Sequence, residues 1–165
     1  MPDELDKTTP TEDDIAKLIA DSNPNFPLTR ANAIAALTPP AGATFNDVRG
    51  RGETGADIIF QFPDGTQFFR EVKCITGGRN AFNSDLRTAV KQLEVPAVRG
   101  DVFIQVPSYY PLQKGMQTFL FYRRQRPDIL EKYQGIRLQV RDETGCILYD
   151  AQILDALKEG RQCDQ

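Results

Sequence analysis

The chain has 165 residues, a length typical of a single domain, and its apolar fraction of 40% is sufficient for a sizeable core. Twenty Lys and Arg residues stand against 23 Asp and Glu residues, which gives a net charge of -3, and there is no histidine. The absence of histidine excludes Ser-His-Asp and Cys-His catalysis and His-ligated zinc, so any catalysis must depend on carboxylates, Lys, Tyr, Ser or Cys.

The predicted elements alternate between helices and strands, which indicates an α/β domain with a mixed sheet. Thr11 and Asp14 form a capping-box-like start, and Thr29 is expected to cap a second helix that ends before Pro39. In chain order we predict a helix at 11–20, strands at 43–48, 55–62 and 66–75, a helix at 81–94, a strand at 101–106, a helix at 113–126, strands at 136–140 and 146–149, and a closing helix at 150–158. One domain over 11–160 is expected, preceded by an acidic, flexible segment (1–10) and followed by a polar tail (161–165).

The amino terminus and the cysteines show no pattern typical of secretion or of metal binding. The amino terminus is acidic and has no apolar signal-peptide region, and no apolar run approaches the length of a membrane span. The three cysteines (Cys74, Cys146 and Cys163) are widely spaced, so neither a disulfide framework nor a thiolate zinc site is expected. These features favour a cytoplasmic protein.

The clearest local prediction is a β-hairpin around Pro63-Asp64-Gly65. If Gly65 takes the left-handed position of a three-residue loop, Phe62 pairs with Thr66 and Asp57 lies directly across from Glu71. In this register one face of the hairpin is apolar except for Arg70, and Asp57, Glu71 and Lys73 share the other face.

Charge is distributed unevenly along the chain. Residues 70–126 hold ten basic and four acidic side chains, a net charge of +6. Such a stretch suits a polyanionic ligand, because contacts with phosphates release counterions. The candidates for substrate phosphate contacts are Arg79, Arg87 and Lys91.

The opposed carboxylates of Asp57 and Glu71 suit a Mg²⁺ ion, which prefers hard oxygen ligands and keeps room for waters and a phosphate oxygen. The backbone carbonyl of Val72 could supply a further ligand. Lys73 shares a strand face with Glu71, where its amine could orient or deprotonate an attacking water or offset charge in a transition state. The competing interpretation is a surface salt-bridge cluster, but like charges directly opposed on neighbouring strands repel each other.

The segment from Gly55-Ala56-Asp57 through the Gly turn to Glu71-Val72-Lys73 resembles the PD-(D/E)xK nuclease superfamily, over about residues 43–106. The resemblance implies a restriction-endonuclease-like αβββαβ core in a mixed sheet flanked by helices. It also implies Asp57 and Glu71 as ligands of Mg²⁺, which Mn²⁺ can replace, and Lys73 as the catalytic lysine. Members of the superfamily often add a Gln or Lys from the next helix, for which Gln92 or Lys91 would serve, and an early-helix carboxylate. Glu12 is a candidate for that carboxylate, and Glu53 competes with it.

We therefore expect a Mg²⁺-dependent phosphodiesterase, an endonuclease rather than an exonuclease, that acts on DNA or RNA. The resemblance allows either a toxin or an endonuclease of a mobile element or restriction system. A toxin would imply an immunity or antitoxin protein as a partner. The alternatives are a catalytically silent nuclease-fold module that binds nucleic acid or a protein, and a protein-interaction domain whose acidic amino terminus contacts a basic partner.

Overall fold

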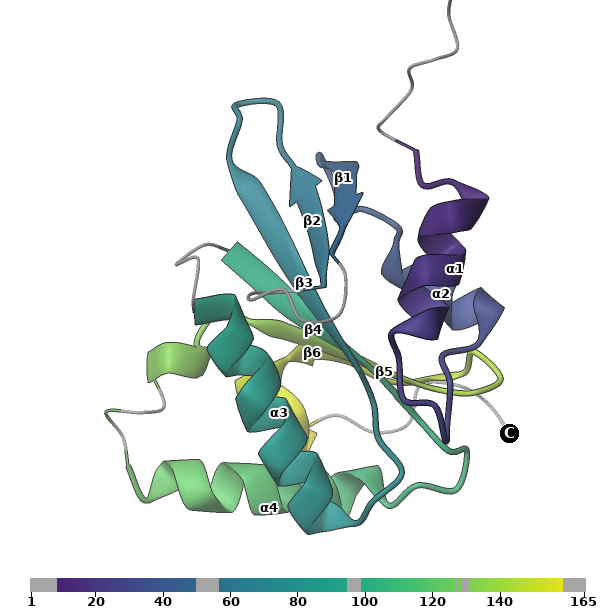
Figure 1. Ribbon diagram of the computed structural model, residues 1–165. Coiled ribbons are helices and arrows are strands. Elements are labelled where there is room, and N and C mark those ends of the chain that lie inside the picture. The colour runs from purple at the N-terminus through teal and green to yellow at the C-terminus, as the bar shows by residue number, and fades with distance from the viewer. Residues whose placement is uncertain (1–8, 50–56, 95–98, 127, 129–130, 159–165) are drawn as a thin grey trace, which may run out of the picture.

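A computed structural model of the chain describes residues 9–49, 57–94, 99–126, 128 and 131–158. Its centre is a six-stranded sheet in the order β1-β2-β3-β4-β5-β6 (Figure 1). The strands are β1 (Thr44–Val48), β2 (Ile58–Gln61), β3 (Gln67–Cys74), β4 (Arg99–Val106), β5 (Arg137–Asp142) and β6 (Ile147–Gln152). β1, β2 and β3 form an antiparallel meander, β3, β4 and β5 run parallel, and β6 returns antiparallel to β5. The predicted α/β class with a mixed sheet is confirmed.

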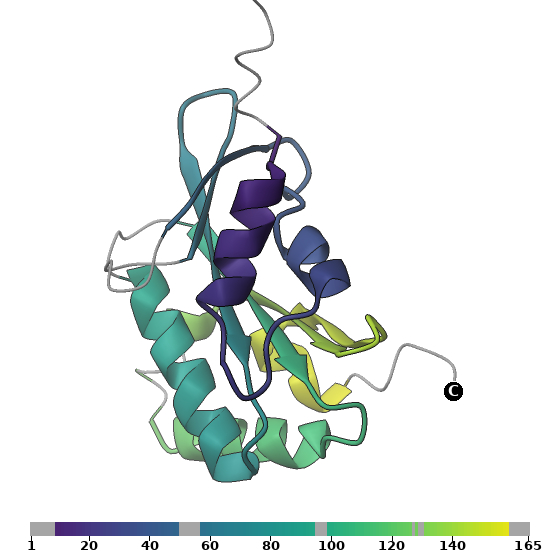
Figure 2. The same ribbon diagram turned by 45° about the vertical axis from the view of Figure 1, so that its right-hand side comes forward.

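Helices flank both faces of the sheet. They are α1 (Glu12–Ala20), α2 (Arg30–Ala36), α3 (Arg79–Glu94) and α4 (Leu112–Arg124), with short 3₁₀ turns η2 (Glu131–Tyr133) and η3 (Ile153–Lys158). Side chains of α1 and α2 pack in one apolar cluster, and those of α3 and α4 pack in another. Phe103 and Ile104, which are neighbours on β4, belong to different clusters and so define the two faces. Figure 2 shows the helix pairs apart, and the β2–β3 turn extends beyond them.

The starts of the first two helices follow from side-chain caps. The backbone N–H of Asp14 donates to the Thr11 hydroxyl, and the Thr11 N–H donates to the Asp14 carboxylate, which is a complete capping box. Thr29 accepts from the N–H of Asn32 in the same way at α2. Both predicted caps are therefore confirmed.

The β2–β3 hairpin has the predicted register. Ile58 lies opposite Arg70 and Gln61 lies opposite Gln67, and the Phe62 N–H donates to the Thr66 carbonyl at 2.8 Å. Gly65 has a φ of +91°, the left-handed conformation that this loop requires. The next pair in this register is Asp57 with Glu71.

Arg70 is buried on the α1–α2 face of the sheet. Its guanidinium forms an ion pair with Asp101 at 2.8 Å and donates to the carbonyl oxygens of Ala36 and Thr38. Arg123 is buried as well, where it donates to Asn83 at 2.7 Å. Two of the ten bases expected to lie along a nucleic-acid backbone are thus structural cations, because their guanidinium groups bind groups inside the fold.

The end of the chain differs from the prediction. A helix over 150–158 is wrong, because β6 remains paired with β5 as far as Gln152 and a 3₁₀ turn follows it. No disulfide framework was expected from the spacing of the cysteines; Cys74 is free, but Cys146 is disulfide-bonded. The expected terminal segments fall mostly outside the described residues. None of the helices in the described part of the chain has the length and apolarity to cross a membrane.

Candidate active site

Asp57 and Glu71 meet where β2 begins, opposite the middle of β3. Asp57 directly precedes β2, and its Oδ2 accepts a hydrogen bond of 2.9 Å from the backbone N–H of Val72. β2 begins at Ile58, so no β2 residue pairs with Val72. The Asp57 carboxylate accepts the hydrogen bond from Val72 that a backbone carbonyl of a neighbouring strand would otherwise accept. Glu71 is only 2% exposed. It lies two residues after Phe69 of the α3–α4 cluster, so both side chains are on the sheet face that α3 and α4 cover.

The Val72 carbonyl lies at the same edge of β3. The N–H and C=O groups of one strand residue point to the same side, and the Val72 N–H points toward Asp57. The ladder between β2 and β3 stops at Ile58 and Arg70, so no residue of β2 pairs with Val72. The edge therefore presents a backbone oxygen beside the Asp57 carboxylate, as the sequence predicts for a third ligand.

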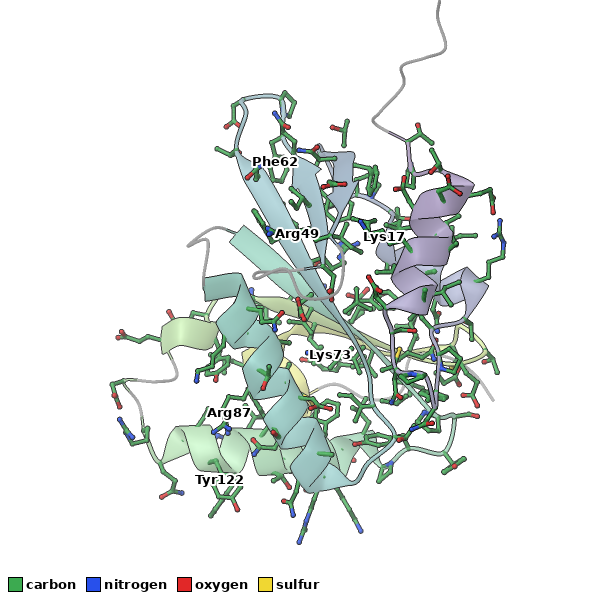
Figure 3. All side chains as sticks on the ribbon, viewed as in Figure 1. Lys17, Arg49, Phe62, Lys73, Arg87 and Tyr122 are labelled. Carbon is green, nitrogen blue, oxygen red and sulfur yellow. The ribbon has the colours of Figure 1, made fainter. Side chains whose placement is uncertain are left out.

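Lys73 is held against the Glu71 carboxylate. Its Nζ lies 3.5 Å from Glu71 Oε2, and its side chain is a quarter exposed, against 3% for Glu71. Figure 3 shows Lys73 in the centre of the molecule, between α3 and the α1–α2 side. The amine thus lies beside its acidic neighbour, and the Lys73 side chain remains partly exposed.

The electrostatics of the two acids reflect this crowding. Burial, together with the negative charge of Asp57, raises the pKa of Glu71 from its ordinary value of 4.5 to about 8, although Lys73 acts in the opposite direction. Burial also raises the pKa of Asp57, against the hydrogen bond from Val72 and the charge of Lys73. With both carboxyl groups ionised, the site would hold more negative charge than one lysine offsets.

The donor set fits a hard divalent cation. The buried Glu71 carboxylate, the partly buried Asp57 carboxylate and a nearby carbonyl oxygen are the ligand types that Mg²⁺ takes from proteins, with waters completing its shell. Among the described residues no group of three or more His, Cys, Asp or Glu side chains is placed to hold a metal. A cation at this site would thus be coordinated by two carboxylates and by backbone or water oxygens.

Asp21 is a carboxylate that the sequence analysis missed. It is the C-cap residue of α1, and its charge contributes to raising the pKa of Asp57. The α1 carboxylate whose charge acts on Asp57 is therefore at the end of the helix rather than at its start. No sequence signal distinguishes Asp21, because its approach to Asp57 depends on how α1 packs.

Glu12 is engaged elsewhere. Its two carboxylate oxygens accept two hydrogen bonds of 2.8 Å from Arg30, and both side chains are exposed. This ion pair lowers the pKa of Glu12, and neither Asp57 nor Glu71 contributes to that shift. The structure does not bring Glu12 to the site, and Glu53 lies outside the described residues.

The candidate residues on α3 lie on different sides of the helix. Asn83 accepts from Arg123 of α4, and Arg87 is one turn further along the same side. Gln92 is nine positions after Asn83, which is half a turn away around the helix, and its side chain is half-buried. Arg87 is therefore placed toward α4 and Gln92 away from it, as Figure 3 shows for Arg87.

Arg79 is the first residue of α3 and Lys91 lies near its end, and both side chains are exposed. Neither forms an ion pair in the described part of the chain. Cys74, next to Lys73, is partly buried, and burial raises the pKa of its thiol to about 11, which is unsuitable for a thiolate nucleophile.

Comparisons with known proteins give no match. No protein-family model, no curated protein and no solved structure matches this chain. The case for a function therefore rests on the geometry of the site.

Proposed function

We propose that this chain is a Mg²⁺-dependent nuclease that hydrolyses phosphodiester bonds of DNA or RNA. The observation that carries the proposal is the opposition of Asp57 and Glu71 across the end of the β2–β3 hairpin, with Lys73 Nζ 3.5 Å from Glu71. The order of helix, β1, β2, β3, α3 and β4, with β4 parallel to β3, supports the restriction-endonuclease-like αβββαβ core.

Each group has a distinct role in this proposal. Asp57, Glu71 and the Val72 carbonyl hold the cation, which when bound polarises the phosphodiester, offsets its charge and lowers the pKa of a water ligand. Lys73 donates a hydrogen bond to the attacking water or to a phosphate oxygen, and its charge opposes the negative charge that develops there. Glu71 positions this amine through their ion pair.

The test is cleavage of supercoiled plasmid and of a mixed RNA pool, each with Mg²⁺, with Mn²⁺ and with EDTA. We expect metal-dependent cleavage that falls by at least about 100-fold in Asp57→Asn and in Lys73→Ala. Asp47→Asn is the matched control, because Asp47 is an exposed carboxylate on β1, and it should retain full activity. The susceptible substrate identifies the nucleic acid.

Two results would contradict the proposal. The first is wild-type inactivity on both substrates together with a melting temperature that Mn²⁺ does not change, since a cation that binds the folded state must stabilise it. The second is binding of nucleic acid without cleavage, unaffected by Asp57→Asn. That result would identify a catalytically silent nuclease-fold module.

A further inference from the structure

The outer side of α4 exposes aromatic side chains. Phe121 is 60% exposed and Tyr122 is 52% exposed, and both lie in the last turn of α4, whose opposite side is buried. Their rings contact each other edge to face, with centroids 5.4 Å apart. We call the exposed residues Lys114, Gln117, Phe121, Tyr122, Arg124 and Gln125 the α4 surface.

The α4 surface is positively charged without compensation. α4 contains no Asp or Glu, and within the described residues neither Lys114 nor Arg124 forms an ion pair. Arg87, which α3 directs toward α4, has no ion pair there either. Figure 3 shows Arg87 and Tyr122 at the α4 end of the molecule.

A shallow hollow lies on this surface. It has a volume of about 340 Å³ and is lined by Gln117, Phe121, Arg124 and Gln125, which follow one side of the helix. The lining combines an aromatic ring, two side-chain amides and a guanidinium. These groups can stack on a nucleobase, hydrogen-bond to its edge and contact its phosphate.

We propose that the α4 surface binds unpaired nucleotides of a nucleic acid, with bases stacked on Phe121 and Tyr122 and phosphates contacted by Lys114, Arg124 and Arg87. Stacking on a side chain requires an open base face, which a continuous duplex does not offer. A second copy of this chain is disfavoured as the occupant, because it would place like charges opposite each other. The proposal deepens the proposed function by naming a substrate class, and it rests on that function for its relevance to cleavage.

The test measures binding in EDTA, so that metal-dependent cleavage does not interfere. Fluorescence anisotropy follows labelled oligothymidylate, oligouridylate and a mixed-sequence DNA duplex over a range of salt concentrations. We expect the wild type to bind at least one single-stranded probe more tightly than the duplex. Phe121→Ala should weaken this binding about 5- to 150-fold without changing its salt dependence.

Arg124→Gln should act differently from Phe121→Ala. Removal of one phosphate contact should reduce the slope of log K against log salt by about 0.7 for a single strand. Ile34→Ala and Arg30→Gln are the matched controls, because both side chains are exposed on α2, on the other face of the sheet. Both should bind like the wild type.

The proposal is overturned if both single-stranded probes bind no more tightly than the duplex, or if Phe121→Ala and Arg124→Gln bind like the two controls. A dimer that Phe121→Ala dissociates, with no loss of binding, would also overturn it and would assign the surface to a second copy. These results are independent of the nuclease test. A wild type that binds through α4 but does not cleave contradicts only the proposed function. A wild type that cleaves, with unaltered binding in the α4 variants, contradicts only this inference.

Discussion

Replacement of Glu71 by Gln should stabilise the metal-free protein at pH 8. Below pH 4.5 Glu71 carries its proton in both the folded and the unfolded chain, so it contributes nothing to the pH dependence of stability. Between pH 4.5 and about 8 the unfolded chain releases this proton while the folded chain retains it. The free energy of unfolding of the wild type therefore falls across this interval, and Glu71→Gln removes that fall.

The size of the effect follows from the burial of the carboxyl group. Glu71 is 2% exposed, and its pKa is about 8 in the folded chain against an ordinary value of 4.5. Such a difference corresponds to an upper limit of about 5 kcal/mol at pH 8, because each pKa unit is worth about 1.4 kcal/mol. Local relaxation and water penetration reduce the penalty of a buried charge, so a measured difference of about 2 kcal/mol or more is expected.

Urea unfolding in EDTA at several pH values between 4 and 9 measures this difference, with Glu131→Gln, an exposed glutamate, as the matched control. Mn²⁺ added at pH 8 should stabilise the wild type more than Glu71→Gln, because the cation favours the ionised carboxylate. An equal pH dependence in the wild type and in Glu71→Gln would refute the reasoning, since burial of Glu71 would then carry no linked proton.

Two further substitutions test the packing around the sheet. Arg70→Met should cost about 3–5 kcal/mol in urea unfolding, because it leaves the partly buried Asp101 carboxylate without its ion pair. Gly115→Ala should cost about 1–3 kcal/mol by the same assay, since the new Cβ would lie 2.9 Å from Cγ of Phe82 in the α3–α4 contact. Gly78→Ala, whose Cβ would meet nothing within 4 Å, should change stability by less than about 0.5 kcal/mol.

The β2–β3 hairpin shows how much of the candidate site was predictable from the sequence. A short loop with glycine in the left-handed position fixes the strand register, and the register alone places Asp57 opposite Glu71. The same alternation predicted that Arg70 would interrupt an apolar face. These predictions succeeded because they depend on residues close together in the chain.

The remaining features depend on contacts between distant segments. Arg70 is a structural cation because Asp101 and the end of α2 lie beside it, and neither is close to it in sequence. The charge of Asp21 contributes to the raised pKa of Asp57 only because the fold brings the end of α1 close to the start of β2. The hydrogen bond from Arg123 to Asn83 shows which side of α3 faces α4, and Arg87 lies on that side, one turn further along. The sequence shows that Arg87 is charged but not which helix its side of α3 faces.

The balance of buried charge favours the Asp57–Glu71 pair as a functional site. Elsewhere in the described core, the buried Arg70 guanidinium forms an ion pair with the Asp101 carboxylate, and the buried Arg123 guanidinium donates to the Asn83 side chain and lies over the Phe119 ring. At the end of the hairpin, by contrast, two carboxyl groups face one lysine, and burial, together with the charge of Asp57, raises the pKa of Glu71 to about 8. A purely structural role would be served better by a neutral residue at either position, because an unbalanced buried charge destabilises the fold. A divalent cation would convert this excess charge from a cost into a binding site.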